Sequence, residues 1–281
     1  MITKLDHLII SVNDITEAEK KFTSLFGIDP VWRGEHSGLG TVNCIFNFKN
    51  TYLELLAAKG EGLGADLVKK TIADKGEGLT GLVLGVDDIH DAKKRIIDKG
   101  FESKNISEGE GKDFDNGESR KWNNLFLPRE LTRGMFSFLI QHTKGKLPEI
   151  DNFPDSSINK LDHVVVNTND PEGFIEIYRD VYGLRLALDQ TVEKWGGRML
   201  FFRVNKTTIE VIARKNDDEI EDTLWGLAWE VESLEKTHER LAGNGFEISD
   251  IKEGRKPNTL VSTVKSDTFG IPTLLIQHLP S

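Results

Sequence analysis

The stretches LDHLII (5–10) and LDHVVV (161–166) place a histidine inside an apolar strand pattern at two distant points of the chain. A buried imidazole needs a hydrogen-bonding partner, a metal ion or a role in chemistry, because an unpartnered polar group is costly in an apolar environment. His7 and His163 are therefore the first candidate functional residues, and the groups that each one faces decide its role.

The two histidine strands begin two long stretches of similar sequence. Each continues into a helical pattern, at 14–27 and 170–183, and each ends with the letters LIQH, at 139–142 and 275–278. Internal similarity over such a length indicates a repeated structural unit. The chain therefore reads as two related halves.

A segment rich in Pro, Asp and Ser separates these halves at 146–159. This composition is typical of a linker. We predict two domains of the same kind, at 1–145 and 160–281.

Each half divides again into two units with the order strand, helix and three strands. In the first half the second unit opens with TGLVLGVDD (80–88) and continues into an amphipathic helix that ends at Gly100; in the second half the same order begins near 224. The predicted fold class is α+β, with four βαβββ modules pairing into two open, barrel-like curved sheets. A small curved sheet cannot bury its concave face alone, so paired modules should enclose a pocket. Whether neighbouring modules pair, or the first faces the third, stays open.

Composition limits the class of partner. The 281 residues include 36 basic and 46 acidic ones, and the basic residues are scattered. This distribution argues against nucleic acid and anionic membranes, so we expect a small-molecule substrate or ligand; a homodimer is compatible with the sequence. No apolar run approaches the roughly 20 residues of a membrane span, and the start MITKLDHLII has no signal-peptide pattern. We therefore expect a cytoplasmic protein. The single Cys44 excludes an intramolecular disulfide.

Two carboxylates occupy matching places in the repeat. Glu54 lies in TYLELLAA and Glu210 in TTIEVIA, and each follows the histidine of its own half by 47 residues. If the first and last strands of a module lie side by side, the imidazole and the carboxylate converge on one face, and borderline divalent ions accept both as ligands. A hydrogen-bonded structural pair would be duplicated equally well, so spacing alone leaves both interpretations open.

On LDHLII, HSGLGT (36–41), YLELLA (52–57) and LIQH, the chain resembles the vicinal oxygen chelate superfamily, in particular its glyoxalase-like branch. That superfamily includes lactoylglutathione lyase, the extradiol dioxygenases and the bleomycin-resistance proteins. Its metal ligands are a His on the first strand and a Glu on the last strand of a module. The resemblance thus implies a divalent ion such as Zn, Ni, Mn or Fe, with His7, Glu54, His163 and Glu210 as its ligands.

The second and fourth modules depart from this pattern. Gly81 and Gly226 align with the two strand histidines, and Phe138 and Leu274 align with the two glutamates. If modules pair in chain order, each sheet therefore holds one His and one Glu in the ligand positions. The family's extradiol cleavage requires ligands at Gly226 and Leu274, so we reject a dioxygenase activity.

Other side chains are weaker candidates. His142 and His278 lie about 13 Å along the strand from the ligand position, which is too far for the same ion without a bend. His36, in a glycine-rich turn, and Trp195 with Arg198, in KWGGRMLFF, are the predicted substrate-binding residues. A solvated loop histidine and an exposed arginine on an edge strand are the alternatives.

The resemblance implies a metal-dependent glyoxalase-like enzyme of the lyase or isomerase type. Its ion would bind two adjacent oxygens of a small substrate, and Glu54 or Glu210 would remove a proton to give an enediolate. The alternative is a non-catalytic protein of the bleomycin-resistance type, which traps a drug or metabolite. The N-terminal half carries the fuller pattern, so we predict that it is the active half.

Overall fold

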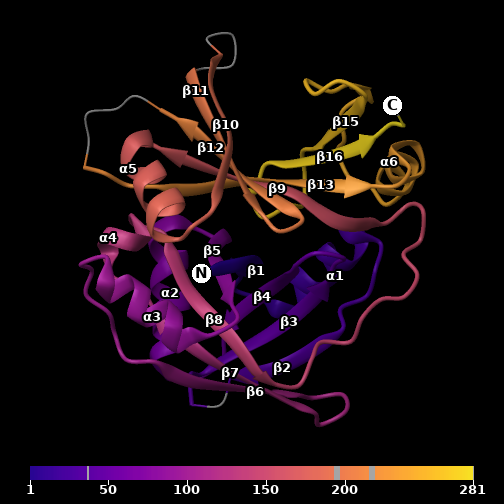
Figure 1. The fold of residues 1–281 in the computed structure, drawn as a ribbon. Coiled ribbons are helices and arrows are strands. Elements are labelled where there is room, and N and C mark those ends of the chain that lie inside the picture. Colours follow the sequence, from indigo (N-terminus) through magenta and orange to yellow (C-terminus); the bar gives the residue numbers. More distant parts are fainter. Residues whose placement is uncertain (37, 193–196, 215–218, 281) are drawn as a thin grey trace.

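A computed structural model of the protein describes residues 1–36, 38–192, 197–214 and 219–280. Its strands form two eight-stranded sheets, one closed into a barrel and one open, with helices at their margins (Figure 1). The predicted α+β class with repeated modules is confirmed.

The first sheet is a closed barrel in the strand order β1-β4-β3-β2-β6-β7-β8-β5. Its elements are β1 (Ile2–Ser11), α1 (Ile15–Phe26), β2 (Trp32–His36), β3 (Thr41–Asn47), β4 (Tyr52–Ala58), α2 (Leu63–Lys75), β5 (Gly78–Val86), α3 (Ile89–Asp98), β6 (Ser107–Asp113), β7 (Ser119–Phe126), α4 (Arg129–Thr132) and β8 (Phe136–Lys144). The first two modules meet at two seams, where β1 pairs with β5 and β2 pairs with β6. The second seam closes a sheet that we had expected to be open.

The second sheet has the order β10-β11-β12-β9-β13-β16-β15-β14. Its elements are β9 (Ile158–Thr168), α5 (Pro171–Ile175), a π-helical segment η1 (Glu176–Val181), β10 (Arg185–Val192), β11 (Gly197–Val204), β12 (Thr207–Ala213), β13 (Thr223–Val231), α6 (Leu234–Gly243), β14 (Lys252–Glu253), β15 (Thr259–Val264) and β16 (Thr273–His278). Neighbouring modules pair through β9 and β13, so pairing follows chain order in both sheets.

The strand register confirms the alignment of the modules. Ile9 pairs with Glu54 in the first module, and Val83 pairs with Phe138 in the second. Phe138 therefore occupies the position of Glu54, as the sequence predicted. Gly81 and Phe138 of the second module thus occupy the positions of His7 and Glu54, and neither can bind a metal ion through its side chain.

Local sequence signals explain where the helices begin. The Asp14 side chain accepts hydrogen bonds from the backbone amides of Thr16 and Glu17, which would otherwise lack partners at the start of α1. Asp88 caps α3 in the same way. The single helix expected at 170–183 is instead the short α5 followed by the π-helical segment.

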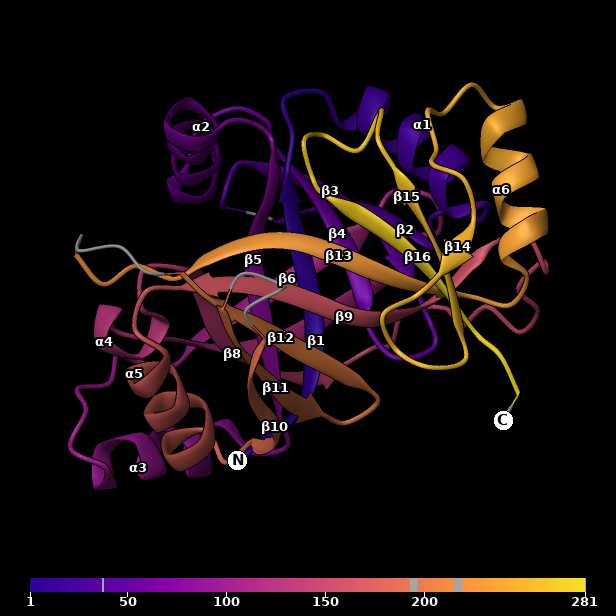
Figure 2. The ribbon, with the colours of Figure 1, turned by 90° about the horizontal axis from the view of Figure 1, so that it is seen from above.

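The two sheets share a core through their outer faces. Leu8 and Ile10 of β1 belong to the same buried cluster as Val164 and Val166 of β9, and Figure 2 shows the second sheet lying across the first. Alternation along β1 turns Ile9 the other way, into a separate apolar cluster with Val83 and Phe138 inside the barrel. The interior of the barrel and the exposed face of the second sheet therefore point away from each other.

Two helices beside the first sheet, α2 and the short α4, were not predicted from the sequence. Helix α2 is the one of these two that lines the cavity. It packs beside β4, and its residues Leu63, Leu67 and Val68 line the barrel cavity. Among the residues that the structure describes, none of the helices combines the length and the apolar character needed to cross a bilayer.

Candidate active site

The barrel encloses a cavity of about 280 Å³. His7, His36, Asn43, Glu54 and Arg120 place polar groups in it, and its walls are mostly apolar and aromatic, from Trp32, Ile45, Tyr52, Trp122, Phe126, Phe136 and Phe138 among others. A concave apolar cavity with a few convergent polar groups is the usual form of a small-molecule site.

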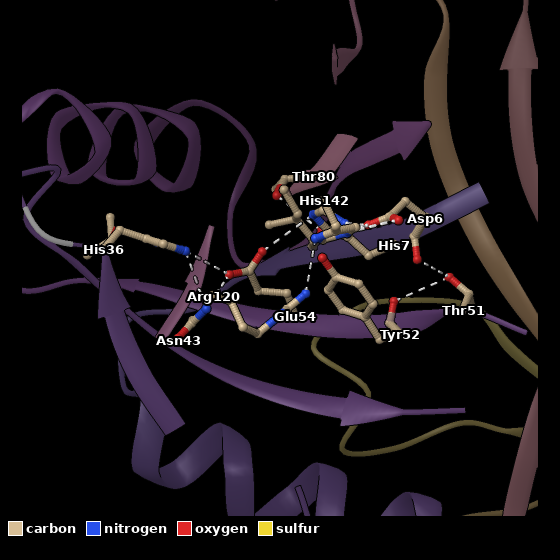
Figure 3. A network of polar contacts seen from close by, with 12 residues as sticks. Asp6, His7, His36, Asn43, Thr51, Tyr52, Glu54, Thr80, Arg120 and His142 are labelled. Atoms are coloured by element: carbon tan, nitrogen blue, oxygen red, sulfur yellow. Dashed lines mark hydrogen bonds and ion pairs between the residues drawn. The ribbon is translucent and has the colours of Figure 1, made fainter. Parts of the chain in front are cut away.

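The Glu54 carboxylate lies at the centre of the polar groups. Its Oε2 is 3.6 Å from Nε2 of His7, its Oε1 is 3.5 Å from Nε2 of His36, and the same Oε1 accepts a hydrogen bond of 2.6 Å from Nδ2 of Asn43. Figure 3 shows the carboxylate between the two imidazoles. The structure thus brings together His7, Glu54 and His36, which the sequence had placed at separate points of the first module.

Asp6 fixes the orientation of His7. Nδ1 of His7 lies 2.8 Å from Oδ1 of Asp6, and Nε2 of His142 lies 3.0 Å from the same oxygen. Because a carboxylate accepts hydrogen bonds, we assign the proton of His7 to Nδ1, which leaves the lone pair of Nε2 facing Glu54. Metal-binding histidines are commonly held by a carboxylate in this way.

The charge of Asp6 follows from its surroundings. Burial alone would raise the pKa of Asp6, but hydrogen bonds from His142 and His7 hold that pKa well below its usual range. Asp6 is therefore an anion at neutral pH although it is almost completely buried.

His36 is a neutral imidazole at the cavity wall. Burial lowers the pKa of His36, and its Nδ1 lies 3.0 Å from Oγ1 of Thr41. If Nδ1 donates to the hydroxyl, the lone pair of Nε2 faces Glu54 and Nδ2 of Asn43. His36 then offers the cavity the same kind of donor atom as His7.

The second sheet repeats this arrangement. Nε2 of His163 lies 3.3 Å from Oε2 of Glu210, Nδ1 of His163 lies 2.7 Å from Oδ1 of Asp162, and Nε2 of His278 lies 2.8 Å from Oδ2 of Asp162. Burial raises the pKa of Glu210. Asp162 and His278 thus correspond to Asp6 and His142, so the hydrogen-bonded network was duplicated together with the fold.

The two sites differ in how closely their possible ligand atoms approach. In the described part of the chain, one group of three possible metal ligands has donor atoms that all lie within 4.8 Å of one another. It lies in the second sheet and consists of Asp162, Glu230 and His278. Protein groups already engage this cluster, since Glu230 pairs with Lys160 and His278 bonds to Asp162.

The atoms of His7, His36 and Glu54 do not meet the same distance condition. Two imidazoles and a carboxylate nevertheless fit the donor chemistry of a borderline divalent ion. The lone pairs of the two imidazole Nε2 atoms and of the carboxylate face one another across the cavity. These electron-rich atoms repel one another, and a bound cation would offset that repulsion.

The other predicted residues lie apart from both sites. Arg198 forms ion pairs with Asp189 and Glu172, and alternation from Phe201, the neighbour of Glu210 on β11, places it on the opposite face of the sheet. Trp195 lies outside the described residues. Cys44 is buried, and burial raises the pKa of its thiol, so it stays protonated.

Sequence reasoning missed Asp6, Asp162 and the role of the two LIQH histidines. The signal was present, because the aspartate in LDH and the histidine in LIQH recur in both halves. Predicting that this aspartate contacts this histidine would have required knowing that the fold brings the ends of β1 and β8 together. Asn43 and Arg120 had no such repeated signal.

Comparisons with known families agree with this architecture. The model of the family described as Glyoxalase-like domain matches residues 5–181, and the model described as Glyoxalase/Bleomycin resistance protein/Dioxygenase superfamily matches residues 160–273. The first match covers more than half of the chain. The protein therefore belongs to the glyoxalase-like domain family, within the vicinal oxygen chelate superfamily that the sequence indicated.

Solved structures share the fold at low sequence identity. A triple mutant of 4-hydroxymandelate synthase from Streptomyces coelicolor has a TM-score of 0.69 at 13% identity, over 100% of this chain and 94% of that one. A Mn(II)-bound glyoxalase from Novosphingobium aromaticivorans has a TM-score of 0.66 at 15% identity, over 99% and 83%. A hypothetical protein from Staphylococcus aureus has a TM-score of 0.64 at 11% identity, over 98% and 99%. A search of curated proteins found no match.

Proposed function

We propose that the barrel cavity is the active site of a metal-dependent enzyme of glyoxalase-like chemistry, which moves a proton on a small substrate with two adjacent oxygen atoms. The observation that carries this proposal is the Glu54 carboxylate held between His7 and His36 in an enclosed, mostly apolar cavity. Membership of the glyoxalase-like family supports the reaction type. The Mn(II) named for the similar Novosphingobium glyoxalase supports the choice of a divalent ion.

His7, His36 and Glu54 would hold the ion, and zinc, nickel, manganese and iron all suit this donor set. Such an ion, when bound, supplies a Lewis acid that polarises the substrate oxygens and makes the neighbouring C–H more acidic. Asp6 contributes by keeping the proton of His7 on Nδ1, away from the cavity.

Glu54 is the proposed base. Nδ2 of Asn43 holds Oε1 of Glu54 at 2.6 Å, which leaves Oε2 as the oxygen that takes the proton from carbon. Returning that proton to the neighbouring carbon or oxygen completes an isomerisation with no net change in redox state.

Hydrogen exchange at carbon tests this proposal. Metal-depleted protein is supplemented with Mn²⁺ and incubated in D₂O with hydroxyacetone, a small compound with two adjacent oxygen atoms, and deuterium incorporation is followed by NMR. Glu54→Gln should slow exchange by about 10²- to 10⁴-fold, the usual contribution of a general base. Glu210→Gln is the matched control and should exchange at the wild-type rate. Exchange that depends on Glu210, or that is unaffected by Glu54→Gln, would contradict the proposal.

A binding protein of the bleomycin-resistance type is the second candidate. The observation that favours it is the spacing of His7, His36 and Glu54, whose atoms do not all lie within 4.8 Å of one another and which have partners within the protein. In that case His7→Ala would leave ligand affinity nearly unchanged. An enzyme whose ion contacts the substrate would lose affinity in the same variant.

A further inference from the structure

Arg120 of β7 is a buried cation in the barrel cavity. Its side chain lies over the rings of Trp32 and Tyr52, at 5.6 and 5.5 Å from their centroids, and the residue is 6% exposed. Nη2 lies 3.4 Å from Nδ1 of His142, which is a weak contact. Nε is buried and has no hydrogen-bond partner.

The charge of Arg120 lacks a direct counter-ion within the described residues, because no ion pair of 4.0 Å or less joins its guanidinium to a carboxylate there. Arg133 shows the usual alternative. It is equally buried and forms ion pairs with Asp222 at 2.6 Å and Asp170 at 3.2 Å. Burying a cation is costly unless it is paired, so an anionic group beside Arg120 would offset this cost.

Two further polar atoms near the cavity are also unpartnered. Oδ1 of Asn43 and Oδ1 of Asn124 are buried without a hydrogen-bond partner, and both residues line the same cavity as Arg120. Buried polar atoms in folded proteins nearly always have partners. Three of them around one cavity point to a polar ligand, and the cationic guanidinium favours one that carries an anionic group.

We propose that Arg120 binds the carboxylate of the ligand, and that the ligand is a small aromatic acid. A guanidinium binds a carboxylate through parallel N–H donors, and Trp122, Phe136 and Phe138 offer aromatic surface for a planar group. The cavity of about 280 Å³ limits the ligand to a ring with a short side chain. This inference rests on the proposed function, since an ion at Glu54 would add positive charge that an anionic ligand offsets.

Calorimetric titration with two matched probes tests this proposal. Phenylacetate carries the carboxylate, and phenylacetamide has the same shape without the charge. The wild-type protein, metal-depleted and then supplemented with Mn²⁺, should bind phenylacetate about tenfold or more tightly than phenylacetamide, as expected for a charge-assisted hydrogen bond. In Arg120→Met the two affinities should become nearly equal. Arg203→Met removes an exposed arginine of the second sheet and should keep the wild-type preference.

The outcomes separate this proposal from the proposed enzyme. Equal affinities for the two probes in the wild type, or no binding of either, would overturn it without any variant. A preference that persists in Arg120→Met would overturn it as well. If that variant does not fold, Arg120→Lys, which keeps the charge without the paired donors, should retain a reduced preference. If the protein binds no Mn²⁺ but still prefers phenylacetate, the proposed metal-dependent enzyme is rejected and the acid-binding site is supported.

Discussion

The barrel and the second sheet carry the same four-residue network in different surroundings. In the barrel the side chains of Asp6 and His7 are 0% and 4% exposed, whereas Asp162 and His163 are 23% and 16% exposed. Both copies have an aspartate that holds the strand histidine and a glutamate that faces it. The duplication preserved the hydrogen bonds, and enclosure is what distinguishes the two copies.

Strand length explains the difference in enclosure. Ser107–Asp113 forms β6, which is long enough to pair with β2 and close the barrel. The corresponding strand of the fourth module, β14, has two residues and pairs with β15 alone among the described strands. The open sheet therefore leaves His163 and Glu210 closer to water. His36 also has no equivalent, because the C-terminal half contains only His163, His238 and His278, and His238 lies on α6.

The largest expected difference between the copies concerns the two aspartates. Asp6→Ala removes a buried anion that serves two histidines, so it should lower the free energy of unfolding by about 3 kcal/mol or more. Asp162→Ala removes a half-buried one and should cost about 1 kcal/mol. Urea denaturation followed by circular dichroism measures both. Equal losses would show that enclosure does not govern the strength of the network.

The β2–β6 seam can be opened by a single methyl group. A Cβ at Gly34 would lie 2.3 Å from the backbone oxygen of Lys112, so Gly34→Ala forces the two strands apart. We expect a loss of about 2 kcal/mol in the free energy of unfolding and weaker phenylacetate binding. Gly243→Ala is the control, because a Cβ there would meet nothing within 4 Å and alanine suits the last residue of α6; it should not lower the free energy of unfolding and should leave phenylacetate binding unchanged. Unaltered phenylacetate binding in Gly34→Ala would show that the site does not depend on closure of the barrel.

Acid should affect the barrel network in a defined direction. The pKa of Asp6 is depressed in the folded protein, so its contribution to stability is fully present above the ordinary carboxyl pKa and is lost as pH falls below that value. Between pH 5 and pH 3 the wild type should lose about 1 kcal/mol more than Asp6→Asn. Urea denaturation at a series of pH values gives the two slopes. Parallel slopes would mean that Asp6 does not titrate with a depressed pKa.

The smallest effect is expected at Glu230, which occupies the position of Gly85 and adds a carboxylate to the second copy. Glu230→Gln weakens the pair with Lys160, and partly exposed pairs contribute about 0.5 kcal/mol. Metal content should not change. A loss of bound metal in this variant would show that the metal binds to the cluster of Asp162, Glu230 and His278 instead.

The sequence predicted the modules well because each part of the repeat carries a local signal. Alternating apolar residues indicated the strands, and the helical pattern at 14–27 contains α1, which begins directly after its Asp14 cap. The module alignment correctly placed Phe138 at the position of Glu54. These features depend on short-range patterns that a single chain displays.

The remaining features depend on long-range contacts. Closure of the barrel follows from pairing between β2 and β6, whose residues are about 75 positions apart. His36 meets Glu54, and Asp6 meets His142, only after the sheet has formed. Helix α2 was missed because glycines surround a weakly amphipathic segment. Arg120 has no pattern in the sequence that sets it apart from other arginines.

Metal content of the purified protein and its two histidine variants tests the central claim most directly. Elemental analysis would be made without added metal or an affinity tag, on the wild type, His7→Ala and His163→Ala. We predict close to one equivalent per chain in the wild type, loss in His7→Ala, and retention in His163→Ala, because only the barrel encloses its network. Two results would contradict the account. One is metal that disappears in His163→Ala and persists in His7→Ala. The other is a folded wild type that contains no metal and takes up no zinc, nickel, manganese or iron.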